Sequence, residues 1–172
     1  ETSAVLNRLA MGFPELRGIR LERNVGQSAA TAAGFREARG EWVGMLDADL
    51  QNPPSELARL WEHLAEADVV LGWRMKREDN WRRRLVSRHA NRIRNAVLGQ
   101  SIRDTGCSVR LFSREAALRL PMFNGFHRFI GPLLAREGYS IKQVPVEHRK
   151  RSRGVSHYNF WNRSLRVVVD LF

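Results

Sequence analysis

The hydrophobic and polar positions along the chain alternate between two spacings, which predicts strands followed by helices. Apolar residues near the start predict a helix around residues 5–9, and residues 18–21 have the pattern of a short strand. The Ala-rich stretch 27–39 predicts a helix that ends at Gly40. The nearly continuous apolar run 42–46 is typical of a strand that is buried on both faces.

The same alternation continues along the second part of the chain. A pair of prolines predicts the start of a helix over residues 53–64, and residues 68–72 and 109–112 have the pattern of buried strands. A helix over 128–138 and a strand with a wetter face over 141–147 follow. Strands that alternate with helices predict an α/β fold, with a mostly parallel sheet flanked by helices.

Composition narrows the class of protein. A chain of 172 residues, 43% of them hydrophobic, has the size of one globular domain. Cys107 is the only cysteine, so an internal disulfide and a thiolate zinc cluster are excluded, and we expect a reducing compartment. No run approaches the roughly 18 to 20 apolar residues that span a bilayer. Membrane contact within these residues is therefore expected to be peripheral.

The charge and the two ends of the chain add two further expectations. A formal net charge of +11 predicts an anionic partner, which could be nucleic acid, lipid headgroups or a phosphorylated substrate. The chain begins almost directly in the first expected helix and stops within the apolar run 167–172. We expect it to be a fragment of a longer protein, with residues 159–172 forming a juxtamembrane helix.

Two carboxylates and an amide follow the apolar run 42–46. In extended backbone, alternate residues share a face, so Asp47, Asp49 and Gln51 are expected to project together. Ligands of open α/β sheets bind beyond the carboxyl ends of the strands. Two carboxylates repel each other unless a cation lies between them, and Mg²⁺ or Mn²⁺ prefers oxygen ligands shared with substrate phosphates. The pattern predicts a metal-bridged diphosphate, with a solvated acidic turn as the alternative.

Seven short segments, in their order along the chain, carry a resemblance to one family. They are residues 23–26, 29–34, 38–40, 47–54, 70–74, 104–112 and 153–158. Together they resemble the family 2 glycosyltransferases of the dolichyl-phosphate mannose synthase and polyprenyl-phosphate glycosyltransferase group. The resemblance covers essentially the whole chain. Cys107-Ser108 and Ser156-His157-Tyr158 depart from the usual Ser-Gly and Ser-Lys-Tyr of that group.

The resemblance implies a fold, a reaction and a site. The fold is GT-A, Rossmann-like, with residues 1–158 as a catalytic domain that lacks the first strand of the family. The reaction is inverting transfer of a hexose from GDP-mannose or a UDP-sugar to a polyprenyl phosphate at the cytoplasmic face of the membrane. Asp47, Asp49 and Gln51 are implied to hold Mg²⁺ or Mn²⁺. The residues expected to bind the donor or the lipid phosphate are Asn24, Gly26, Asp47, Gly72, Arg74, Arg88, Arg149, Arg151 and Ser156, and the catalytic ones Asp49, Asp104 and Arg103.

Two basic segments suit a phosphorylated lipid. If residues 81–98 form a helix, arginines recur every four residues beside an apolar line, as in helices that lie on an anionic membrane. Arg88 and Arg103 are the expected phosphate ligands, because arginine can grip a phosphate with two nitrogens. A solvated charged face is the alternative. The basic stretch 148–154 is expected either to close over the donor diphosphate or to touch the membrane.

The mechanism and its rivals can be stated from the same residues. A phosphate monoester has a second pKa of roughly 6, so its oxygen is already a nucleophile near neutral pH. Asp104 would serve as a catalytic carboxylate only for a hydroxyl acceptor; otherwise it is a cap or an ion-pair partner of Arg103 or Arg110. Rival functions are nucleic-acid binding, nucleotidyl transfer and a processive polysaccharide synthase. The first leaves the carboxylates unexplained, and the last requires a Gln-X-X-Arg-Trp signature that this sequence lacks.

Overall fold

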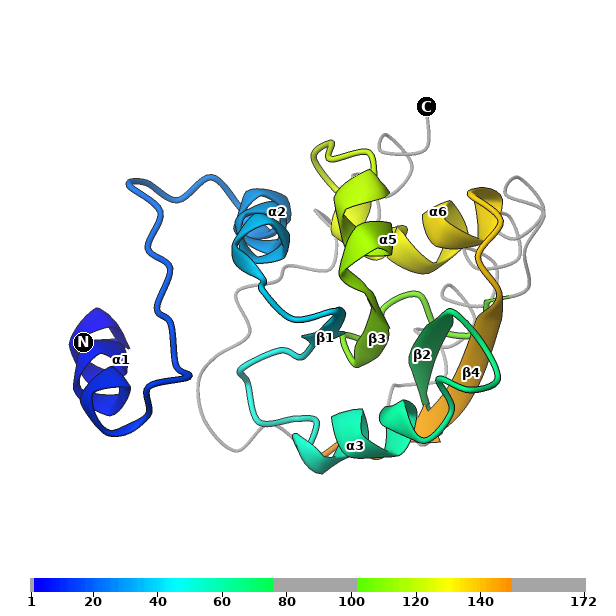
Figure 1. The fold of residues 1–172 in the computed structure, drawn as a ribbon, viewed down its shortest axis with the longest axis horizontal. Helices are drawn as coiled ribbons and strands as arrows, with labels where there is room; N and C mark the ends of the chain where they lie inside the picture. Colours follow the sequence, from blue (N-terminus) through cyan, green and yellow to red (C-terminus); the bar gives the residue numbers. More distant parts are fainter. Residues whose placement is uncertain (1, 76–101, 150–172) are drawn as a thin grey trace, which may run out of the picture.

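The computed structural model describes residues 2–75 and 102–149 (Figure 1). The elements are α1 (Thr2–Gly12), α2 (Gln27–Glu37), β1 (Trp42–Met45), α3 (Ser55–Trp61), β2 (Val69–Arg74), β3 (Arg110–Ser113), α5 (Arg114–Arg119), the short 3-10 helix η1 (Phe126–Arg128), α6 (Ile130–Arg136) and β4 (Ile141–Val146). Several sequence predictions lie outside the described residues: the helix at 81–98 with Arg88, the residues Arg151 and Ser156, and the helix at 159–172.

The four described strands form one mixed sheet in the order β1-β3-β2-β4. Strand β3 is antiparallel to both of its neighbours, and β2 is parallel to β4. Strands β1, β2 and β4 therefore run in the same direction, and β3 alone runs against them. Arg110 of β3 pairs with Met45 of β1 and with Leu71 of β2, so β3 begins where β1 and β2 approach their carboxyl ends. The predicted α/β architecture is confirmed, and the sheet is mixed.

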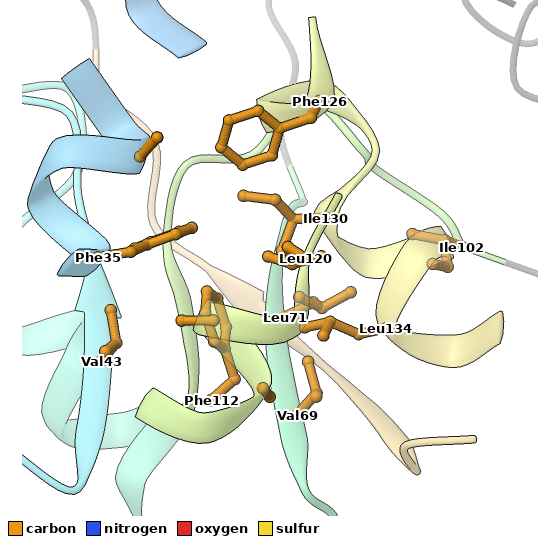
Figure 2. Packing of buried hydrophobic residues seen from close by; sticks show 13 residues of the cluster. Phe35, Val43, Val69, Leu71, Ile102, Phe112, Leu120, Phe126, Ile130 and Leu134 are labelled. Atoms are coloured by element: carbon orange, nitrogen blue, oxygen red, sulfur yellow. The ribbon is translucent and has the colours of Figure 1, made fainter. Parts of the chain in front are cut away.

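Helices cover both faces of this sheet. In Figure 1, α2, α5 and α6 lie on one side and α3 on the other. On the first side, Phe35 of α2 packs edge-on against Phe112 of β3 and Phe126, as Figure 2 shows. On the second side, Leu60 of α3 is fully buried in a cluster with Val70 and other strand residues. Each large side chain buried in this way contributes roughly 1.5 to 3 kcal/mol relative to its exposure.

The first 26 residues lie to one side of the sheet (Figure 1). Helix α1 contains no buried residue, and the predicted strand at 18–21 is wrong, because the structure shows irregular backbone there. A strand needs a neighbouring strand for its backbone N–H and C=O groups, and this segment has none among the described residues. An ion pair of 2.7 Å between Arg17 and Glu37 links the segment to α2.

Several predicted boundaries also change. Helix α2 ends at Glu37 rather than at 39, since Ala38 is already extended, and α3 ends at Trp61 rather than at 64. The expectation that the strand following Gly40 is buried on both faces is wrong, because β1 lies at an edge of the described sheet and only Val43 in it is buried. Helix α5 was not predicted, although Ser113 caps it by accepting a hydrogen bond from the Ala116 N–H at 3.1 Å.

Candidate active site

One edge of the sheet gathers most of the residues that the sequence analysis selected. Strands β1, β2 and β4 all end at this edge and β3 begins there, so four loops meet. They contribute the turn 47–52 after β1, Arg74 at the end of β2, the segment 103–110 that leads into β3, and residues 147–149 after β4. We call this region the carboxyl edge.

The turn after β1 differs from the extended backbone that the sequence predicted. Asp49 Oδ1 accepts a hydrogen bond from the Gln51 N–H at 3.1 Å, which closes a tight turn. Leu50 between them has a positive φ of 62°, a conformation that a leucine rarely adopts. The Asp47 N–H donates to Ser108 Oγ at 3.3 Å, which ties the turn to the loop before β3. The carboxylates are thus presented by a turn rather than by one face of a strand.

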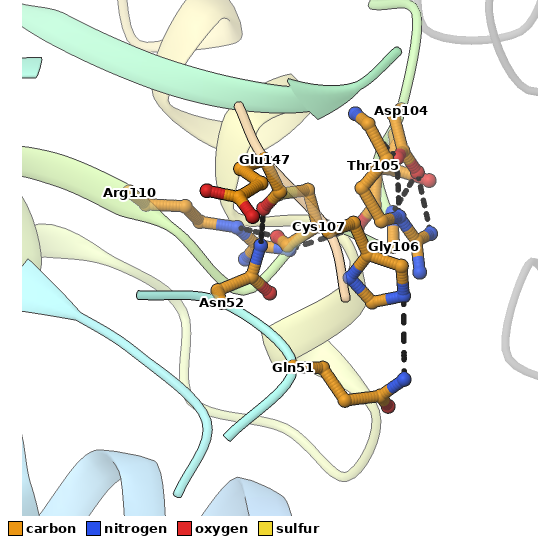
Figure 3. Close-up of polar contacts among 10 residues, drawn as sticks. Gln51, Asn52, Asp104, Thr105, Gly106, Cys107, Arg110 and Glu147 are labelled. Atoms are coloured by element: carbon orange, nitrogen blue, oxygen red, sulfur yellow. Dashed lines mark hydrogen bonds and ion pairs between the residues drawn. The ribbon is translucent and has the colours of Figure 1, made fainter. Parts of the chain in front are cut away.

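The end of β4 holds this turn from its other side. Asn52 is 5% exposed, and its Nδ2 donates to the Glu147 carbonyl at 2.6 Å. The Arg149 N–H donates to the Gln51 carbonyl at 2.7 Å, and Gln51 Nε2 donates to the Arg149 carbonyl at 3.2 Å. Figure 3 shows Asn52 directed at Glu147. We call these three hydrogen bonds the clasp. Asn52 was not predicted to be a site residue, although it lies in the segment 47–54 that carries part of the family resemblance.

Asp104 is held by Arg74, a partner that the sequence analysis did not propose. Arg74 donates from Nε and Nη2 to the two carboxylate oxygens of Asp104, at 2.7 and 2.9 Å. The backbone N–H groups of Arg74 and Gly106 also donate to this carboxylate, at 3.3 and 3.1 Å. The predicted ion pair of Asp104 therefore exists, but with an arginine of β2.

Arg110 is a buried arginine that the sequence analysis mentioned only as a possible partner of Asp104. It is 6% exposed, and its guanidinium donates to the carbonyl oxygens of Thr105, Cys107 and His127. Burial lowers the pKa of Arg110, whereas the nearby carboxylates Asp104 and Asp47 act against that shift. An arginine keeps its proton at neutral pH in any case. A permanent positive charge therefore lies within the carboxyl edge.

Cys107 is structural in this arrangement. Its side chain is 1% exposed and belongs to the core beneath α3. Burial raises the pKa of the Cys107 thiol above its ordinary value, so the thiol stays protonated near neutral pH. A protonated, buried thiol is a poor nucleophile and a poor metal ligand. The neighbouring Ser108 carries the polar contact instead, through its hydroxyl group.

The two exposed arginines at this edge have defined contacts. The guanidinium of Arg103 lies 5.2 Å from the centre of the Trp73 ring, and its backbone N–H donates to Gln143 Oε1 at 2.8 Å. Arg149 forms an ion pair of 2.8 Å with Glu147, and this hydrogen bond raises the pKa of Arg149. Both side chains are at the surface, where a phosphate could reach them.

The remaining predicted donor residues lie elsewhere. Gly72 is buried within β2, where its N–H donates to the Val109 carbonyl at 2.8 Å. Asn24 Oδ1 accepts a hydrogen bond of 3.1 Å from the N–H of Gly26, which has a φ of 87° at the start of α2. Asn24 and Gly26 line an open cleft of about 600 Å³ against α1. The described residues that line this cleft do not include the carboxylates, so the structure does not bring the two groups into one hollow.

The turn after β1 fits a metal only under one condition. Within residues 2–75 and 102–149, no group of three or more His, Cys, Asp and Glu side chains is arranged to hold a metal ion. Two carboxylates in one turn suit Mg²⁺ or Mn²⁺ when the other oxygen ligands come from substrate phosphates and water. Asp47 and Asp49 therefore suit the predicted ion only as part of a ligand set that substrate oxygens and water would have to complete.

The sequence and the site together define the class of protein. Residues 1–120 match the sequence model of glycosyl transferase family 2, so the chain belongs to that family. It is 35% identical over 161 residues to the dodecaprenyl-phosphate galacturonate synthase of Rhizobium johnstonii, a match that covers 91% of this chain and 47% of that protein. The chain thus spans about half the length of this curated relative. The family that the sequence motifs predicted is confirmed.

Solved structures with a similar backbone identify the fold. A glucosyl-3-phosphoglycerate synthase from Mycobacterium tuberculosis, solved with Mn²⁺ and UDP-glucose, matches with a TM-score of 0.62 and 21% identity over 94% of this chain and 57% of its own. A mycobacterial protein matches with a TM-score of 0.62 and 24% identity, covering 94% of this chain and 54% of its own. The predicted GT-A fold is confirmed. None of the helices in the described part of the chain has the length and apolar character needed to cross a bilayer.

Proposed function

We propose that this glycosyltransferase moves a sugar from a nucleotide-diphosphate donor to the phosphate of a polyprenyl lipid, with inversion at the anomeric carbon. The observation that carries the proposal is the meeting of the Asp47–Asp49 turn with the arginines Arg74, Arg103 and Arg149 at one edge of the sheet. The similarity to a dodecaprenyl-phosphate galacturonate synthase supports the lipid acceptor. Both reactants would be multiply charged phosphates, which require cations around the reacting atoms.

The donor diphosphate is assigned to the turn after β1. Asp47 and Asp49 would hold Mg²⁺ or Mn²⁺, and that ion would offset the charge that grows on the departing nucleoside diphosphate. Gln51 donates from Nε2 to the Arg149 carbonyl, so its amide oxygen is the atom assigned to the ion. Arg149 would contact the diphosphate from the end of β4. Asn24 and Gly26 would bind the remainder of the donor, together with Arg151 and Ser156, which lie outside the described residues.

The acceptor phosphate is assigned to the exposed Arg103, together with Arg88 from the segment outside the described residues. The guanidinium of Arg103 lies over the Trp73 ring at the surface, and an arginine there can contact a phosphate through two nitrogens. A lipid phosphate is ionised near neutral pH, so no general base is required. The enzyme's task is then to align one oxygen with the anomeric carbon.

The contacts of Asp104 favour a phosphate acceptor over a hydroxyl acceptor. A hydroxyl must lose its proton to a base, and Asp104 is the carboxylate that the sequence offered for this role. Its oxygens already accept bonds from Arg74 and from the Gly106 N–H. A base at this position would have to give up some of these hydrogen bonds in order to accept a proton. A hydroxyl acceptor remains the second candidate, with Asp104 as the base.

The place of the reaction is part of the proposal. The net charge of +11 suits an anionic membrane surface, and a polyprenyl phosphate presents its headgroup at such a surface. We infer that the domain works at the cytoplasmic face and contacts the membrane peripherally. A nucleic-acid partner is not needed to explain the charge, because the donor, the acceptor and the membrane are all anionic.

The proposal is tested by a transfer assay on the full-length protein. Radiolabelled GDP-mannose, UDP-glucose, UDP-N-acetylglucosamine and UDP-galacturonate are each offered with undecaprenyl or dolichyl phosphate and Mn²⁺. We expect lipid-linked product from one donor, lost with a chelator and reduced at least about 100-fold in Asp49→Ala. Glu62→Ala, a carboxylate change at the end of α3, serves as the matched control and keeps full activity. Product on a hydroxyl compound but not on lipid phosphate would refute the acceptor.

A further inference from the structure

We propose that Arg110 is a positioning residue for sugar transfer, which holds the Asp104 loop in register with the carboxylate turn and with the start of α2. The proposal rests on the proposed function only in assuming that the reaction is a glycosyl transfer, whatever its acceptor. Arg110 is the first residue of β3, and it reaches its partners from beneath the carboxyl edge rather than from the surface.

All three guanidinium nitrogens of Arg110 have a backbone acceptor. Nε donates to the Cys107 carbonyl at 2.9 Å, Nη2 to the Thr105 carbonyl at 2.8 Å, and Nη1 to the His127 carbonyl at 2.7 Å. Figure 3 shows Arg110 directed at the 105–107 stretch. The planar, rigid fork of an arginine can satisfy three carbonyls in three directions, which a single ammonium nitrogen cannot do in the same geometry.

The loop 104–108, which Arg110 holds through two carbonyl groups, makes one contact with β2 and another with the turn after β1. Asp104, one residue before Thr105, forms an ion pair with Arg74 of β2. Ser108, one residue after Cys107, accepts a hydrogen bond from the N–H of Asp47. The loop therefore sets the position of the Asp104 carboxylate and of the Asp47 backbone together. A shift of this loop by a fraction of an ångström would change both.

The third carbonyl extends the same connection to α2. The side chain of His127 lies 2.8 Å, Nδ1 to Oγ, from Ser28, and Ser28 Oγ also accepts the Gly125 N–H at 2.8 Å. Ser28 is 7% exposed and lies two residues after Gly26, at the start of α2. A continuous set of buried and partly buried polar contacts thus runs from Asp104 through Arg110 to the beginning of the helix that follows the predicted donor residues.

The buried positive charge of Arg110 also interacts with nearby carboxylates. A structural tie between loops can be made by neutral groups, and burying a charge is costly unless opposite charge lies near. Asp47 and Asp104 supply that opposite charge, since both oppose the effect of burial on the pKa of Arg110. Positioning and charge therefore act on the same two groups.

The test compares two arginines at opposite ends of one strand. Arg110→Lys keeps the charge but loses the three-way fork. Arg114→Lys is the matched control, because Arg114 directly follows β3 and its Nε also donates to a backbone carbonyl, that of Ala38, at 2.7 Å. Both variants are made in the full-length protein. The initial measurements are kcat, KM for the donor and the midpoint of thermal unfolding.

We expect Arg110→Lys to lower kcat at least about tenfold, with the donor KM within about threefold of wild type. Arg114→Lys should leave kcat and the donor KM within about twofold of wild type, while its Tm changes by a similar amount to that of Arg110→Lys. Equal kcat values for the two variants would overturn the inference. If Arg110→Lys does not fold, Ser28→Ala cuts the same set of contacts at its far end. A fall in kcat at unchanged Tm then supports the inference, and an unchanged kcat overturns it.

Amide hydrogen exchange separates this inference from the proposed function. The N–H groups of Gly106 and Asp47 should exchange faster in Arg110→Lys than in Arg114→Lys, because their acceptors belong to the loop that Arg110 holds. If wild-type protein hydrolyses the donor without making lipid product, the acceptor assignment fails, and hydrolysis rates serve for the kinetic comparison. If no turnover is found at all, equal exchange in the two variants overturns the role of Arg110.

Discussion

Arg74 and Asp104 form a two-pronged ion pair at the end of β2, with nitrogen-to-oxygen distances of 2.7 and 2.9 Å. Their side chains are 15% and 7% exposed. Removal of one partner therefore leaves a largely buried charge without its counter-ion, whereas removal of both leaves none. The pair links a strand that ends at the carboxyl edge to the loop that precedes β3, so it bears on stability and on the site together.

A double-mutant cycle on this pair should show strong coupling. Arg74→Met should lower the free energy of unfolding by about 3 kcal/mol, because the buried carboxylate loses its partner. Asp104→Asn should cost less, since the amide keeps the shape and one acceptor. We expect the double variant to be more stable than the sum of the two changes by about 1 to 3 kcal/mol, measured by urea unfolding. Additive changes would show that the two side chains do not interact in solution.

Leu50 should tolerate glycine better than valine. Its φ of 62° is unfavourable for a side chain with a Cβ atom and worse for a β-branched one, and its side chain is 65% exposed, so little packing is lost on removal. We expect Leu50→Gly to match or exceed wild-type stability and Leu50→Val to fall by about 1 kcal/mol in urea unfolding. Leu118→Gly, an exposed leucine in helix α5, is the control and should lose about 1 kcal/mol. Equal losses for both glycine variants would contradict the left-handed backbone.

Gly72 should resist even the smallest side chain. A Cβ atom there would lie 2.9 Å from a methyl of Val146 and 3.0 Å from the backbone oxygen of Val109. We expect Gly72→Ala to cost about 1 to 3 kcal/mol in unfolding free energy. Gly44→Ala is the control, because its nearest neighbours are flexible methyl groups of Leu57 at 3.3 and 3.4 Å, and it should cost little. Similar stability of the two variants would show that β2 can shift away from β3.

Asp68 should make stability depend on pH in the acid range. Hydrogen bonds from the Ser140 hydroxyl and the Ser140 N–H lower the pKa of Asp68 below its usual 3.8. This contribution is therefore present above the ordinary pKa and is lost as the pH falls through the lower pKa of the folded state. Asp68→Asn should be less stable than wild type by about 0.5 kcal/mol at pH 7, a small value because the group is exposed to solvent.

The measurement for Asp68 is thermal unfolding as a function of pH. The difference in Tm between wild type and Asp68→Asn should shrink as the pH falls below about 4. Glu62→Gln is the control, an exposed carboxylate of the segment after α3, and its Tm difference should be small at every pH. A difference for Asp68→Asn that persists at low pH would mean that the charge of the carboxylate plays no part.

The sequence was sufficient for the strands with long apolar runs and for the chemistry that follows them. β2 and the place of Asp47 and Asp49 directly after a strand were both predicted, because apolar spacing and carboxylates after a strand are local properties. The tight turn that carries them was not, since extended backbone was expected there. The direction of β3 was not, since it depends on how the chain crosses the carboxyl edge at residues 102–109. The strand expected at 18–21 failed for the related reason that strand formation requires a neighbour.

The contacts that position the site were the least predictable. Arg110 lies in a run of residues that reads as an ordinary strand, and nothing local shows that its guanidinium is buried against three carbonyls. Asp104 was predicted to pair with an arginine, but the choice of Arg74 depends on the pairing of strands far apart in sequence. Polar residues near the start of a strand can therefore be identified as candidate site residues from the sequence. Their hydrogen-bond and ion-pair partners can be identified only from the folded structure.

The clasp has a consequence for synthesis on the ribosome. Asn52 is made long before the backbone carbonyl that it needs, since Glu147 lies 95 positions further along the chain. The turn with the two carboxylates can therefore not reach its final form until β4 has left the exit tunnel. A nascent chain that stalls before residue 147 would present β2 with one side open to other strands. The turn that carries Asp47 and Asp49 thus takes its final form only after β4 has been made and has paired with β2.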